Sequence, residues 1–159
     1  MRADTLDNSG GNLLSDQGLT LKIEQALLNV KGLISAAGVE LGASRLDNRE
    51  GKVSSALDAR LVVNEDLLND QGEIVSAGHT QLKAASLDNT AGQVLGDVSL
   101  DVKVKGALNN QAGTLGAGTS LNVQAASLDN RQAGKLGSDG QLKATIDGLF
   151  RAHSPLAVP

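Results

Sequence analysis

Cysteine is absent from the 159 residues, so the chain can form neither disulfides nor thiolate metal sites. Proline occurs twice, methionine once, and Phe150 is the single aromatic side chain. The core must therefore be built from Leu, Val, Ile and Ala, whose small shapes suit many thin and similar layers. Because there are 19 glycines, we expect the turns to use glycine rather than proline.

Charge of one sign is not concentrated anywhere in the chain. The net charge is −4 at pH 7 and Lys and Arg are scattered, which excludes the basic footprint of a nucleic-acid-binding protein. No hydrophobic run is long enough to span a membrane, and Met1 leads into the first repeat without the apolar segment of a signal peptide. We therefore expect no nucleic-acid partner and no membrane insertion, in a chain that either stays inside the cell or is a piece of a longer protein.

What the chain does contain is one motif, Leu-x-Asn-x-x-Gly-x-apolar, repeated seven times. Its leucines, 19 to 21 residues apart, are Leu6, Leu27, Leu46, Leu67, Leu87, Leu108 and Leu128. Its asparagines are Asn8, Asn29, Asn48, Asn69, Asn89, Asn110 and Asn130. A glycine follows three residues after each asparagine, except in the last copy, where one extra residue places it at Gly134. A period near 20 residues is typical of a solenoid.

The second half of each repeat alternates between apolar and polar residues, as in residues 19–23, which indicates a half-buried strand. Two or three such short strands joined by tight turns make one coil of a parallel β-helix. We therefore predict an all-β fold, a parallel β-helix of about seven coils with ~20 residues each. Residues 1–146 are expected to form one repeat array, and residues 147–159 either a cap over the last layer or a disordered tail.

The asparagines and leucines of the motif are expected to form ladders along the winding axis. Asparagine tolerates the left-handed conformation, and side-chain amides stacked at about 4.8 Å can hydrogen-bond to one another. The glycine that follows opens a turn in which a Cβ would clash. Aspartate precedes asparagine only in alternate copies, at Asp7, Asp47, Asp88 and Asp129. The predicted structural unit is therefore a pair of coils of ~40 residues, which keeps carboxylates out of adjacent layers.

Segments such as Leu46–Val53 and Leu33–Gly38 resemble the twenty-residue haemagglutinin repeat. This repeat belongs to filamentous haemagglutinins and to contact-dependent growth-inhibition exoproteins, and the resemblance covers about residues 6–146. It implies a right-handed parallel β-helix in the shaft of a secreted or cell-surface exoprotein. It further implies two-partner secretion, with an outer-membrane transporter as partner and folding outside the cell. The nearest partners would be adjoining β-helix segments, since the family's secretion and toxin domains are not matched.

The function expected on these grounds is that of a non-catalytic structural shaft segment. The alternative is a binding module that uses an outward face to contact a glycan or a cell-surface receptor. Outward lysines of four coils are the candidates for that face: Lys22, Lys83, Lys103 and Lys143. The competing interpretation is that these lysines form the solvated side of the strands and discourage lateral pairing.

No motif predicts catalysis, a cofactor or a metal. A glycosidase needs two convergent carboxylates, and sugar grooves usually offer aromatic faces, of which this chain has one. The alternating aspartates would lie about 9.6 Å apart, too far for neighbours to share a calcium ion. We therefore expect solvated turn carboxylates. His79 and His153 are interpreted as isolated surface residues.

Overall fold

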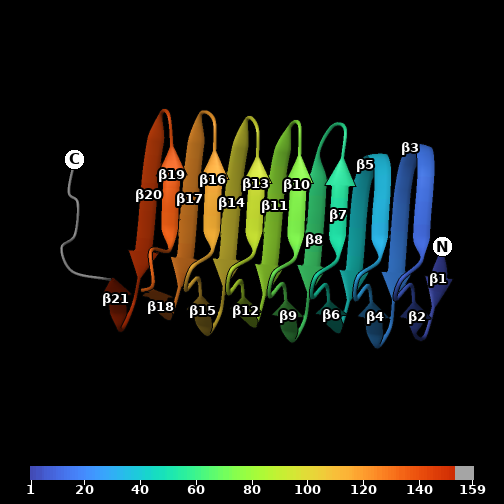
Figure 1. Cartoon of the computed structure of the whole chain (residues 1–159), viewed down its shortest axis with the longest axis horizontal. Coiled ribbons are helices and arrows are strands. Elements are labelled where there is room, and N and C mark those ends of the chain that lie inside the picture. The colour runs from blue at the N-terminus through green and yellow to red at the C-terminus, as the bar shows by residue number, and fades with distance from the viewer. Residues whose placement is uncertain (153–159) are drawn as a thin grey trace.

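A computed structural model describes residues 1–152 of the chain as an all-β solenoid without a helix. The chain winds from β1 at one end of a rod to β21 at the other, in about seven similar coils (Figure 1). Every pair of neighbouring strands is parallel, in one sheet of 13 strands and another of 8. The predicted parallel β-helix is therefore confirmed. Residues 1–152 contain no helix that is long and apolar enough to cross a membrane.

The strands stack in three columns, which each coil visits in the same order. The short column is the 8-stranded sheet: β2 (Leu6–Asp7), β4 (Ala26–Leu28), β6 (Arg45–Asp47), β9 (Asp66–Leu68), β12 (Ser86–Asp88), β15 (Ala107–Asn109), β18 (Ser127–Asn130) and β21 (Phe150–Ala152). The second column contains β7 (Lys52–Ser55), β10 (Glu73–Ser76), β13 (Gln93–Gly96), β16 (Thr114–Ala117) and β19 (Lys135–Ser138). The third contains β8 (Ala59–Val63), β11 (His79–Ala84), β14 (Ser99–Val104), β17 (Ser120–Ala125) and β20 (Gln141–Ile146).

The first two coils join the second and third columns without a break. Here β3 (Asn12–Ile23) and β5 (Leu33–Ala43) each run through both columns, and β5 pairs with β7 over one half and with β8 over the other. β1 (Arg2–Ala3) pairs with the third-column half of β3. One irregularity interrupts the register of β3 and β5, between Ser15 and Gly18.

The core is a set of aliphatic columns along the axis. The motif leucines are successive partners in the short column, and from Leu27 to Leu128 each is at most 1% exposed. Strand alternation fills the remaining space with Leu, Val, Ile and Ala from the other two columns, while their polar neighbours face solvent. A coil alone cannot bury its apolar face, so the stability of this fold comes from stacking.

The corner between the third and short columns shows the predicted pairing of coils. We number the coils from the one that begins at Leu6. The corner contains two bend residues in odd-numbered coils, as at Glu24 and Gln25, and one in even-numbered coils, as at Ser44. The single bend residue and its successor both donate to one carbonyl below: the backbone N–H groups of Ser44 and Arg45 bind Gln25 O, each at 3.0 Å. One carbonyl thus serves two donors, which allows a shorter corner to lie on a longer one.

The array extends beyond the predicted boundary at Ile146. β21 pairs with β18, and Phe150 takes the place of the motif leucine above Leu128. This strand was not predicted, because Phe150-Arg151-Ala152 has neither the leucine nor the asparagine of the motif. Residues 153–159, the rest of the predicted cap or tail and the site of His153, lie outside the described residues.

Candidate functional site

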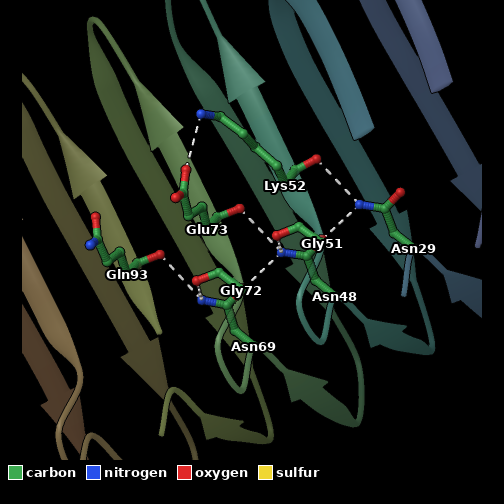
Figure 2. Close-up of polar contacts among 8 residues, drawn as sticks. All are labelled: Asn29, Asn48, Gly51, Lys52, Asn69, Gly72, Glu73 and Gln93. Carbon is green, nitrogen blue, oxygen red and sulfur yellow. Dashed lines mark hydrogen bonds and ion pairs between the residues drawn. The ribbon is translucent and has the colours of Figure 1, made fainter. Parts of the chain in front are cut away.

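The main polar feature of the interior is a ladder of asparagine side chains. In each coil the amide nitrogen Nδ2 donates to Oδ1 of the asparagine in the next coil, at 2.7 Å in all six steps from Asn8 to Asn130. Figure 2 shows the part of the ladder from Asn29 to Asn69. From Asn29 to Asn110 these side chains are 0% exposed. The ladder is therefore a continuous buried chain of hydrogen bonds, with every donor directed toward the C-terminal end.

The second amide hydrogen of each asparagine ties two coils together. Nδ2 of Asn48 approaches the carbonyl of Gly51 in its own coil at 3.4 Å and that of Glu73 in the next coil at 3.1 Å (Figure 2). The same pair of acceptors recurs from Asn8 to Asn110. A buried amide needs partners for both hydrogens, and this corner supplies them.

The motif glycine is required by close approach of the neighbouring coil. A Cβ on Gly51 would lie closer than 3.0 Å to the carbonyl oxygen of Asn29 in the preceding coil, and also to Oδ1 of Asn48 at 2.7 Å. Equivalent overlaps occur at the motif glycines from Gly32 to Gly134. The glycine thus permits the layers to come together at the ladder, as the sequence predicted.

The left-handed conformation, in contrast, was predicted for the wrong residue. The asparagines do not have positive φ; the residue immediately before the motif glycine does, with φ of 55° at Lys31 and 52° at Ala91. The backbone N–H of the glycine binds the asparagine carbonyl three residues earlier, at 3.1 Å from Gly32 to Asn29. A four-residue turn with positive φ at its third residue is characteristic of type II. Asparagine is therefore selected for its amide and not for its backbone.

The alternating aspartates stabilise the same turn in odd coils. A carboxylate oxygen accepts the backbone N–H two residues later, at 2.9 Å from Ser9 to Asp7 and at 3.1 Å from Thr90 to Asp88. In this column the aspartates alternate with Leu28, Leu68 and Asn109. Carboxylates are thereby kept two layers apart, as expected.

Asp47 departs from the expectation of solvated carboxylates, since it is only 5% exposed. Its partners on either side are Leu28 and Leu68, which shield it. Arg49 compensates with two hydrogen bonds, Nε to Oδ1 at 2.9 Å and Nη2 to Oδ2 at 2.7 Å, and these lower the pKa of Asp47. Arg131 binds Asp129 in the same way and lowers its pKa also.

The candidate lysines do not form one stripe. Lys83 and Lys103 are direct partners on β11 and β14. They share an outward row with Lys22, but Gly42 and Val62 separate Lys22 from them. Lys143 lies in the neighbouring row, next to Asn122 on β17. The structure therefore brings only Lys83 and Lys103 together, at a shallow depression of about 120 Å³ lined also by Gln81, Leu82 and Asp101.

The remaining titratable side chains in the described part of the chain are scattered. Within residues 1–152 no group of three or more His, Asp and Glu side chains could hold a metal ion. His79 is exposed, with its ring nitrogen Nδ1 bound to the Ser99 hydroxyl and its backbone N–H to Asp58. The carboxylate binds the backbone and not the imidazole, so these three residues lack the relay of a hydrolase triad.

Comparison with known proteins agrees with the repeat and the fold. The family model described as haemagglutinin repeat matches residues 1–64, 62–107 and 75–149. Neither the comparison with curated proteins nor that with solved structures gave a match. Matches over nearly the whole chain, together with a solenoid whose coils follow the motif, show that the chain belongs to the haemagglutinin repeat family.

Proposed function

We propose that this chain is a length of rigid, non-catalytic shaft in a large adhesin-like exoprotein. Membership of the haemagglutinin repeat family supports the general role. The observation that carries the shaft assignment is the asparagine ladder, which holds the same geometry over seven coils. Each added coil contributes one further hydrogen bond of 2.7 Å to the ladder. The architecture therefore fits a spacer whose length is set by the number of coils.

Rigidity follows from the way each coil is held. Between the ends of the rod, strands of all three columns are paired on both sides, and the corner amides add bonds to the next coil. Bending the rod would stretch these bonds and open gaps between the close-packed aliphatic layers. Ion pairs along the surface, such as Lys52 with Glu73 at 3.0 Å (Figure 2), are exposed and add little.

The non-catalytic part of the proposal is supported by where the polar groups lie. The buried polar side chains are asparagines, serines, a threonine and Asp47. Their hydrogen bonds go to one another, to the backbone and to Arg49. They stabilise turns and coil contacts and do not converge on a pocket that would hold a substrate.

Location and export are part of the same proposal. Family membership supports a secreted or cell-surface location. We infer two-partner secretion through an outer-membrane transporter, with contact-dependent inhibition systems among the candidate parents. A cysteine-free chain that gains its stability layer by layer suits export in an unfolded state, because each coil can be added to the one before it.

Spin labels test the shaft, since the chain has no cysteine of its own. Ser9→Cys and Gln132→Cys place labels on the turns of the first and seventh coils, six layers or about 29 Å apart. Deletion of residues 46–86 removes one pair of coils and should shorten this distance to about 19 Å, with a narrow distribution. Deletion of residues 46–66 removes one coil and should destabilise the rod, because two even coils then meet. A broad distance distribution in the undeleted chain would exclude a rigid shaft.

A second candidate function is binding of an acidic glycan by Lys83 and Lys103. The observation in its favour is that these like charges are direct partners on neighbouring strands, which an anion would stabilise. A double Lys83→Ala and Lys103→Ala variant should then lose retention on an acidic glycan, while Lys22→Ala and Lys143→Ala should change it little. Equal retention of the double variant and the unchanged chain would exclude this surface.

A further inference from the structure

One edge of the rod carries acidic charge only. It is formed by the turns that join the second column to the third, along the upper border of Figure 1, and by the matching segments of β3 and β5. Its residues are 15–18, 36–38, 56–58, 77–79, 97–99, 118–120 and 139–141. They include no Lys or Arg but four exposed aspartates, which are Asp16, Asp58, Asp97 and Asp139. Since the chain has 18 acidic and 14 basic side chains, these four equal its entire excess of negative charge.

The four aspartates of this acidic edge follow the two-coil alternation already seen at the corners. One lies in each of coils 1, 3, 5 and 7, whereas the edge residues of coils 2, 4 and 6 carry no carboxylate. Aspartates of successive odd coils are therefore two layers or about 9.6 Å apart, too far to share a metal ion. Charges that are scattered in the sequence thus come together along one edge, with a regular spacing.

The outward face of the third column carries cations with the same alternation. Its exposed side chains lie in two parallel rows, with Arg60 and Lys143 in one row and Lys22 and Lys103 in the other. Coils 1, 3, 5 and 7 thus each contribute one cation to this basic face. The cations of the basic face and the aspartates of the acidic edge therefore have the same two-layer repeat.

The two surfaces are also complementary in shape. Leu57 and Val98 are the large hydrophobic side chains that are exposed in coils 2–6, at 64% and 40%, and both lie on the acidic edge. The basic face has a shallow depression of about 430 Å³ at Gly42 and Val62, in coils 2 and 3, besides the smaller depression between the lysines of coils 4 and 5. The larger side chain, in coil 3, and the smaller one, in coil 5, each have a depression at their own level of the rod.

We propose that the acidic edge of one copy binds the basic face of a second copy, with the two rods parallel and their coils in register. Each aspartate then faces the cation of the same coil, in the pairs Asp16 with Lys22, Asp58 with Arg60, Asp97 with Lys103 and Asp139 with Lys143. The two rows of the basic face are about 6.6 Å apart, a difference that the long lysine side chains span. Leu57 enters the depression of coils 2 and 3, and burial of its apolar surface stabilises the contact.

The remaining charges of the basic face favour this register. Displacement by one coil would place the aspartates opposite coils 2, 4 and 6, where Glu40 repels them and Lys83 is the one cation. In register, Glu40 faces the uncharged edge of coil 2 and keeps its own contact with Arg60 at 3.7 Å. Asp101, the other carboxylate of this face, shares its depression with Lys83 and Lys103, which offset its charge.

The association continues from copy to copy, because the acidic edge and the basic face are different surfaces of every rod. It widens the assembly without lengthening it, so that shafts lie side by side. This goes beyond the role of a single shaft, which stands whether or not shafts associate. The ion pairs are exposed, so each is weak and is screened by salt.

Sedimentation velocity of the full chain over a concentration series tests these surfaces. At low salt we expect species at multiples of 16.2 kDa that increase with concentration and decrease with added salt. Negative-stain images should show rods that become thicker without becoming longer. An edge variant, Asp97→Lys combined with Asp139→Lys, should weaken association about tenfold or more. Its matched control is Glu50→Lys combined with Asp70→Lys, at the corner between the short and second columns, which changes the net charge equally and should associate at least as strongly as the unchanged chain.

Spin labels at Ser9→Cys and Gln71→Cys report the orientation of the rods. Both labels lie on turns of the motif, away from the two surfaces, in coils 1 and 4. In parallel rods in register, the distance between equivalent labels of two copies is the same at both sites. Antiparallel rods would bring the Gln71 labels level with each other but would separate the Ser9 labels by about 29 Å along the axis. We expect equal distances, and a much longer distance at Ser9 would overturn the parallel arrangement.

Charge exchange between two chains provides the decisive comparison. A face variant, Lys103→Asp combined with Lys143→Asp, should weaken association as the edge variant does. Mixed with the edge variant it should form complexes, because the cationic edge of one variant then meets the acidic face of the other. Circular dichroism verifies that each variant is folded. Folded variants that stay monomeric when mixed, an edge variant that associates like its control, or an unchanged chain that stays monomeric at low salt would each overturn the proposal.

Discussion

The carbonyl oxygen of Asn29 lies directly against the α-carbon of Gly51 in the next coil, where any side chain would collide with it. This contact couples the two most regular residues of the motif. The asparagine positions the backbone of its coil through the amide ladder, and the glycine of the following coil leaves room for that backbone. Neither residue can be exchanged without the other coil being displaced.

Gly51→Ala should therefore destabilise the rod by about 2–3 kcal/mol, since the added methyl group must displace backbone and not a flexible side chain. Gly137→Ala is the matched control, because a Cβ at Gly137 would meet no atom within 4 Å. Urea denaturation followed by circular dichroism measures both. Similar midpoints for the two variants would show that the coils at Gly51 can separate at little cost.

The ladder itself is tested by Asn69→Ala. This change leaves the Nδ2 donor of Asn48 and the Oδ1 acceptor of Asn89 without their partners in the interior. Each buried unsatisfied group costs about 1–3 kcal/mol, so we expect a loss of several kcal/mol in unfolding free energy. Asn122→Ala on β17 is the contrasting control, because Oδ1 of Asn122 is buried without a hydrogen-bond partner, so its removal breaks no bond and should not lower the unfolding free energy. Hydrogen exchange at Gly72 and Gly92 should accelerate in Asn69→Ala alone.

The repeating parts of this structure could be predicted from the sequence because every coil packs on its neighbours in the same way, with the same types of residue at the same positions. Leu46, Leu67 and Leu87 are predictable as one column, since a single misplaced layer would expose all of them. The burial of Asp47 was not predictable in this way. It depends on Leu28 and Leu68 in the coils on either side and on Arg49, and these contacts exist only once the coils are in register.

The last coil and the lysine rows were not predicted. Phe150 takes the leucine position above Leu128 and is 47% exposed, but a phenylalanine without the asparagine two residues later does not match the motif. Lys103 is the fifth residue of β14 and Lys143 the third residue of β20. Because β14, β17 and β20 pair in step, these two positions lie in adjacent rows.

Ala91→Gly should stabilise the protein slightly. Ala91 is exposed and held at φ 52°, which costs an L-residue roughly 1–2 kcal/mol, more than the roughly 0.5–1 kcal/mol of chain entropy that glycine adds to the unfolded state. Ala56→Gly, at another exposed turn position without positive φ, should lose about 0.5–1 kcal/mol. Thermal melts of the two variants should therefore shift in opposite directions, and shifts of the same sign would contradict the strain assigned to Ala91.

The last prediction concerns acid stability at Asp47. Hydrogen bonds from Arg49 lower the folded-state pKa of Asp47 below that of an unfolded chain, about 3.9. The stabilisation is therefore fully present above pH 4 and is lost as the pH falls through the folded-state pKa. In Arg49→Ala the buried carboxylate keeps its two leucine neighbours but loses its cation, so its pKa should rise and the acid transition should move to higher pH. Arg60→Ala removes an exposed arginine whose distance to Glu40 is 3.7 Å, and should leave the transition in place. Melting temperatures between pH 2 and pH 7 distinguish these cases, because an Asp47 that contributes nothing would give three superimposable curves.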